Sequence, residues 1–245
     1  MLLLATLLIL AAFGATTVDL QPSALRVAVT AVVAVLAPLC WPGSAAISIP
    51  ALIPTRTALR IAAWSAAAAC VAAIALRILG STAQPWSRIA PCCLMLLPIL
   101  LVTHAAAAGL EGQLRSRSAD AHGERELAGR TVAIGLALLG ALPLWLGPAA
   151  ELLSDRHAWL IDAVIGASPL THLAVASGND LLRNQWFYQH SNLAALRFSY
   201  PGLLELAMSY AAVCALLALL SLVMRRSRRL AADAAGTLSN SQRTQ

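Results

Sequence analysis

The sequence predicts an all-α fold, a polytopic membrane helix bundle, and two features of its composition carry this prediction. Apolar residues make up 59% of the 245 residues and charged residues only 11%, whereas ordinary soluble domains contain about 45–50% and about 25%. The apolar residues also occur in blocks of roughly 20, the length of helix that crosses a hydrocarbon layer about 30 Å thick. A soluble single domain is excluded, because too few polar residues remain to cover its surface.

Six apolar blocks are expected to form transmembrane helices within a transmembrane domain at 1–224. These spans cover approximately residues 2–17, 24–40, 58–79, 89–109, 131–146 and 203–224. The first block could be a signal peptide, but it lacks a basic amino-terminal region and a clear cleavage pattern, so we expect a retained helix. The remaining residues, 225–245, are predicted to form a basic and polar cytoplasmic tail.

Proline, glycine and charged residues separate the later blocks. The second block is broken at Trp41-Pro42-Gly43, and the third follows Arg56. The fourth contains Pro91 and Pro98, which membrane helices tolerate where neighbouring helices satisfy the freed carbonyls. The fifth begins after Arg130, at the end of the hydrophilic stretch 110–130.

That hydrophilic stretch has two interpretations. Mixed charges between two spans most often form a solvated connection. The alternative is that Glu124, Arg125 and Glu126, on a short helix, contact a separate subunit.

The distribution of arginine predicts the orientation in the membrane. The chain has 17 basic residues, all of them arginine, and a formal net charge of +6. If both termini are cytoplasmic, eleven arginines lie inside, as the positive-inside rule requires. If residues 158–178 formed a seventh span, the arginine clusters at 115–130 and 225–229 would lie on opposite sides of the membrane. We therefore expect 158–178 to be a broken interfacial or re-entrant segment between helices five and six that does not cross.

Motifs for enzymatic chemistry are absent from the sequence. The chain has no lysine, so it cannot carry the Walker A motif of an ATPase, and H-E-x-x-H and G-x-S-x-G are also missing. The five cysteines show no C-x-x-C spacing and are interpreted as small residues of lipid-embedded helices. We expect no enzymatic activity, no cofactor, no metal and no nucleic-acid partner. His104, within the fourth block, is interpreted as a hydrogen-bonded residue of helix packing.

Most of the chemical variety lies in the outer segment at 151–202. Its candidate functional residues are Asp162, His172, Asp180, Arg183, Trp186, Tyr188, His190 and Arg197. The aromatic residues fit the belt at the outer headgroup level, with a substrate-binding surface as the alternative.

Several polar side chains in the outer segment need partners or ligands. Asp162 at membrane depth requires a partner, which Arg156, His172 or Arg183 could supply, and a structural clamp is favoured over a proton relay. A metal or haem site at His172, Asp180 and His190 is the least favoured interpretation, since the spacing matches no ligand signature.

Six spans, cytoplasmic termini and a broken helical pair at 158–178 resemble the membrane subunit of an ABC-2-type exporter. The resemblance is one of topology and hydropathy, and the start at Met1-Leu2-Leu3-Leu4 departs from the amphipathic helix that begins many such permeases. It implies an inner-membrane protein that pairs with a separate ATPase subunit, forms a homodimer or hetero-oligomer in the lipid, and moves a hydrophobic or amphipathic substrate. The competing interpretations are a non-transporting accessory or assembly subunit and, third, an intramembrane enzyme.

Reporter fusions test the orientation directly. Fusions after Asp120 and Ser239 should report a cytoplasmic location, and a fusion after Ser191 should report the outer side, because the arginine-rich segments stay inside. A cytoplasmic signal at Ser191 would contradict the topology and remove the basis of the exporter resemblance.

Overall fold

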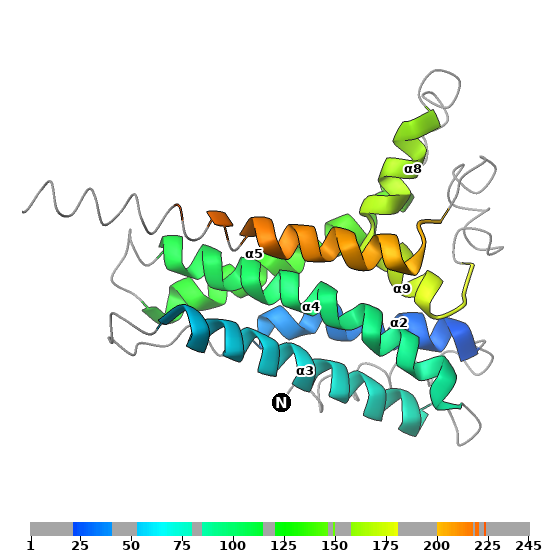
Figure 1. The fold of residues 1–245 in the computed structure, drawn as a ribbon, viewed down its shortest axis with the longest axis horizontal. Helices are drawn as coiled ribbons and strands as arrows, with labels where there is room; N and C mark the ends of the chain where they lie inside the picture. Colours follow the sequence, from blue (N-terminus) through cyan, green and yellow to red (C-terminus); the bar gives the residue numbers. More distant parts are fainter. Residues whose placement is uncertain are drawn as a thin grey trace, which may run out of the picture.

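The fold is a bundle of helices, shown in Figure 1. The computed structural model describes residues 22–40, 53–79, 85–114, 121–146, 149, 158–180, 200–217, 219–220 and 223. In this part the helices are α2 (Pro22–Leu39), α3 (Ile53–Leu79), α4 (Trp86–Leu114), α5 (Ala121–Gly140), α6 (Leu142–Trp145), α8 (Ala158–Ala167), α9 (Pro169–Ala176) and a carboxy-terminal helix, Leu203–Leu217. The predicted first span at 2–17 and the tail at 225–245 lie outside the described residues.

The all-helical prediction is confirmed for the described part, but the six spans are not. By length and composition, two helices there can cross a membrane, Ala58–Ile78 and Trp86–Leu114, and a bent pair at α8 and α9 would be a third. The apolar helices Ser23–Leu39 and Leu203–Leu217 are shorter. The coarser description, an all-α protein with membrane-spanning helices, is the one that the structure supports.

The largest boundary error concerns the fifth predicted span. Instead of beginning at about 131, α5 begins at Ala121, inside the hydrophilic stretch, and ends at Gly140. Charged side chains therefore occupy its first turns, and Glu126 and Arg130 form an i, i+4 ion pair that supports helix there. The short helix expected for Glu124, Arg125 and Glu126 is consequently the beginning of a 20-residue helix.

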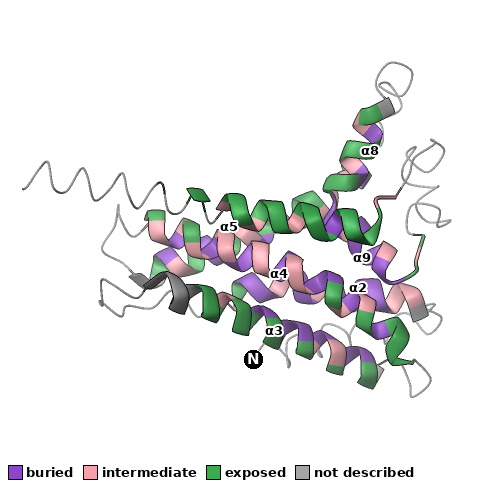
Figure 2. Ribbon diagram, in the orientation of Figure 1, coloured by how far each residue is buried: buried purple, intermediate pink, exposed green. Residues whose placement is uncertain are grey.

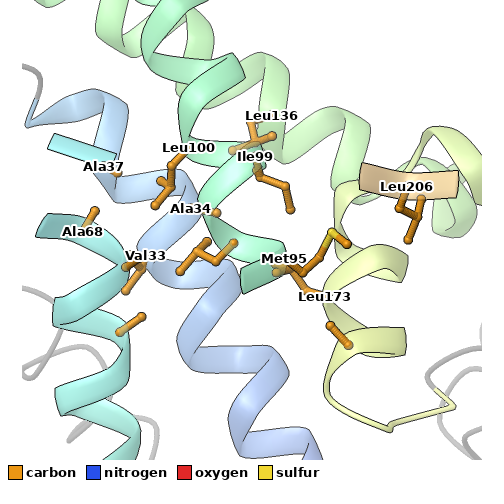
Figure 3. Packing of buried hydrophobic residues seen from close by; sticks show 14 residues of the cluster. Val33, Ala34, Ala37, Ala68, Met95, Ile99, Leu100, Leu136, Leu173 and Leu206 are labelled. Carbon is orange, nitrogen blue, oxygen red and sulfur yellow. The ribbon is translucent and has the colours of Figure 1, made fainter. Parts of the chain in front are cut away.

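The long helix α4 lies at the centre of the bundle and contacts α2, α3, α5 and α9. Pro91 and Pro98 lie within this 29-residue helix, as the sequence predicted. Figure 3 shows that the core around α4 combines large side chains such as Ile99 with small ones such as Ala34, so that the helices approach closely.

The outward faces of the long helices are also apolar. Leu94 is 68% exposed and Ile134 is 61% exposed, and exposed residues cover most of the carboxy-terminal helix in Figure 2. Water would oppose so much exposed apolar surface, whereas lipid chains accept it. The arrangement therefore fits a bundle surrounded by hydrocarbon.

The backbones of α5 and α2 approach closely at Gly129 of α5. A Cβ atom built there would lie 2.5 Å from the carbonyl oxygen of Pro38, near the end of α2. This neighbour is backbone and cannot rotate away, so only glycine fits without moving α5 from α2.

The variant Gly129→Ala should therefore destabilise the bundle by about 1–3 kcal/mol, because the added methyl group forces two packed backbones apart. The matched control is Gly135→Ala on the same helix, where nothing lies within 4 Å of the added atom and the alanine should favour helix by about 0.5–1 kcal/mol. Thermal unfolding of the purified proteins in detergent measures both. Equal melting temperatures for the two variants would contradict the close approach.

Candidate functional site

The candidate site is the bent pair formed by α8 and α9, whose axes differ by 78°. The bend occurs where the sequence predicted a break, since Ser168 is extended and Pro169 starts the next helix without a backbone N–H. In Figure 1, α8 projects away from the bundle, whereas α9 packs into it. Ser168 fastens the bend by donating from Oγ to the carbonyl of Gly140, 2.9 Å away at the end of α5.

Two side chains of α9 satisfy the carbonyls that the bend leaves at the end of α8. The Thr171 hydroxyl lies 2.6 Å from the Ile165 carbonyl and 2.7 Å from the Ser168 carbonyl, and the Ile165 carbonyl also accepts from the Ser168 N–H. His172 donates from Nε2 to the Gly166 carbonyl at 2.9 Å. A carbonyl can only accept, so the proton of a neutral His172 imidazole lies on Nε2 and its Nδ1 is an acceptor.

The acceptor nitrogen of His172 connects the bend to the carboxy-terminal helix. The hydroxyl of Tyr210 donates to Nδ1 over 2.7 Å, and the two rings meet edge to face with centroids 5.5 Å apart. His172 is buried. It therefore joins three helical segments through two hydrogen bonds and one aromatic contact.

The other end of α9 is held by a buried arginine. Gly178, at φ +65, ends the helix with the paired bonds of a Schellman motif, from its own N–H to Val175 and from Asn179 N–H to Ala174. Arg26 of α2 donates from its guanidinium to the carbonyl of Ser177 at 2.7 Å. A cation at this position also opposes the partial negative charge of the helix end.

In the sequence, Arg26 is one of the 17 arginines and belongs to no motif that would assign it a contact. Its position one turn inside an apolar block was the available sign of a buried partner. The partner lies 151 residues away, so the pattern could not name it. The Ser177 hydroxyl also lies 3.4 Å from the Cys92 thiol of α4, so the same end of α9 contacts both α2 and α4.

The three predicted outer-segment residues that the structure describes, Asp162, His172 and Asp180, do not come together in one site. Asp162 is exposed on α8, while His172 is buried in α9 with both ring nitrogens engaged as described. Asp180 is exposed and accepts a hydrogen bond from the Tyr200 hydroxyl. The other five candidates, Arg183, Trp186, Tyr188, His190 and Arg197, lie outside the described residues. Among the residues that are described, no group of three or more His, Cys, Asp and Glu side chains could hold a metal ion.

The three residues of the predicted subunit contact differ in accessibility. Glu124 is buried, Arg125 is half-buried and Glu126 is exposed. Of these three residues, only Arg125 and Glu126 are therefore accessible to another protein.

His104 is a hydrogen-bonded packing residue, as predicted. Its Nδ1 lies 2.9 Å from the Ser65 hydroxyl of α3, and the ring also bonds the backbone of Ala37 in α2. It thus links α4 to two neighbouring helices inside the bundle.

No family model, curated protein or solved structure matches the chain.

Removing the Tyr210 hydroxyl tests whether its hydrogen bond to His172 holds α9 against the carboxy-terminal helix. Tyr210→Phe leaves Nδ1 of buried His172 without a donor and should lower the free energy of unfolding by about 1–3 kcal/mol. The matched variant Tyr200→Phe removes an exposed hydrogen bond and should change stability by no more than about 0.5 kcal/mol. Thermal unfolding in detergent distinguishes the two variants. An unchanged melting temperature for Tyr210→Phe would show that the hydrogen bond between Tyr210 and His172 does not stabilise the contact of α9 with the carboxy-terminal helix.

Proposed function

We propose that the chain is the integral membrane subunit of an ABC-type exporter of the inner membrane, which moves a hydrophobic or amphipathic substrate with energy from a separate ATPase subunit. The observation that carries the proposal is the bent pair of α8 and α9, with one helix packed in the bundle and the other projecting from it. A broken segment at this place in the chain is the feature on which the resemblance to ABC-2-type permeases depends.

The contacts of α9 support a mechanical role for the bend. This helix touches α2, α4 and α5, and it is bonded to Arg26 at one end and to Tyr210 near the other. A shift of the long helices would therefore displace α9, and the projecting α8 would move with it. In the proposed exporter this movement opens or closes the outer end of the substrate path.

The source of energy follows from composition. Without lysine the chain has no P-loop to hold the phosphates of ATP. Energy for transport must then come from a separate ATPase subunit or from an ion gradient. In the proposed exporter an ATPase partner engages the cytoplasmic end, where the first turns of α5 present Arg125 and Glu126 in the proposed orientation. Transmission from this surface would run along α5 to Gly140, the residue bonded to Ser168 at the bend.

Affinity purification from membranes tests the proposal. The wild-type chain should retain an ATPase subunit, and the double variant Arg125→Ala/Glu126→Ala should lose it while still inserting into the membrane. The matched control, Arg88→Ala/Glu205→Ala, removes one charge of each sign from exposed side chains that do not belong to α5 and should keep the partner.

Two results would contradict the proposal. Unchanged co-purification of the ATPase subunit with the Arg125→Ala/Glu126→Ala variant would show that these two residues do not form the ATPase contact. Retention of redox or envelope-assembly proteins in place of an ATPase would instead favour the accessory or assembly subunit.

A further inference from the structure

Two carboxylates are buried at the end of the bundle where α4 leads into α5. Glu111 is 0% exposed and Glu124 is 6% exposed. Glu111 lies three residues before the last residue of α4, and Glu124 lies three residues after the first residue of α5. Since the two helices form an antiparallel hairpin and pack against each other, both carboxylates are at the same level of the bundle.

The end of α2 adds negative charge to the same region. Gly129 of α5 abuts the carbonyl of Pro38, one residue before the end of α2. In Figure 1 the two helices run in opposite directions, so Glu124, five residues earlier in α5, lies beyond the carboxy-terminal end of α2. Helix ends of this kind carry about half a negative charge, and neither α2 nor α4 has a basic residue in its last turn.

The burial of the Glu124 carboxylate is not explained by any hydrogen bond among the described residues. Both of its carboxylate oxygens are buried, and neither has a hydrogen-bond partner among the described residues. The amino-terminal end of α5 offers about half a positive charge, which offsets only part of the Glu124 carboxylate. Buried carboxylates in proteins are normally paired or coordinate a cation.

We propose that Glu124 and Glu111 bind a hard cation, such as Na⁺, K⁺, Mg²⁺ or Ca²⁺, beyond the end of α2. Carboxylate and carbonyl oxygens are the ligands that such ions prefer, and water completes their coordination. Among the described residues no group of three or more His, Cys, Asp and Glu side chains could hold a metal ion, so in this proposal carbonyl oxygens and water supply the other ligands. The site is independent of the exporter proposal, because it requires neither an ATPase nor movement of α8.

Thermal unfolding of the purified full-length chain in detergent tests the site. The protein is prepared in choline chloride, and NaCl, KCl, MgCl₂ or CaCl₂ replaces choline at constant ionic strength. At least one of these cations should raise the melting temperature saturably, on the order of 5 °C when its concentration is a hundred times Kd.

Two substitutions on α5 identify the ligand. Glu124→Gln keeps the shape and removes the charge, so it should abolish the cation-dependent rise. The matched control Glu126→Gln alters an exposed carboxylate of the same helix and should keep it. If Glu124→Gln does not fold, Glu124→Asp replaces it and should raise Kd at least tenfold.

The proposal is overturned if no cation raises the melting temperature of the wild-type chain. It is also overturned if Glu124→Gln responds as the wild type does.

Discussion

At the bend between α8 and α9 Pro169 interrupts the helical hydrogen bonds of the backbone, and the rest of the site depends on how the carbonyls at the end of α8 are satisfied. The carbonyls of Ile165 and Gly166 accept from the side chains of Thr171 and His172. In a lipid environment each unsatisfied carbonyl would cost several kcal/mol, because no water is present to bond it. The side chains that close the bend therefore also determine where α9 meets the bundle.

Close packing imposes the second constraint on the arrangement. Lipid chains are as apolar as leucine, so burial of apolar surface does not by itself hold membrane helices together. Small residues such as Ala34 and Ala68 let α2 and α3 approach the core, and Gly129 lets α5 touch the backbone of α2. Apolar residues consequently lie on both the inner and the outer faces of these helices.

The buried polar groups differ in what they do for the structure. Arg26 bonds the carbonyl at the end of α9, His104 bonds Ser65, and His172 bonds Tyr210, so each joins helices of the bundle. Glu124 has no such bond among the described residues. Buried ionisable residues within membrane bundles commonly mark ion or substrate paths. Arg26, His104 and His172 are each hydrogen-bonded to another helix, whereas the Glu124 carboxylate is left to bind a cation in the proposed site.

The sequence by itself determined the helical class, the apolar exterior and the break before Pro169, because each is a local property of composition or of one residue's backbone chemistry. The predicted start of α5 was wrong, because the hydrophilic composition before residue 131 indicates a loop, although Glu126 and Arg130 form an ion pair that stabilises a helix there. Only the tertiary structure decided which polar residues meet. The partners of Arg26 and His172 lie 151 and 38 residues away, and the burial of Glu124 depends on where α2 ends beside α5. Such pairings arise from the packing of whole helices, and no local pattern in the sequence specifies them.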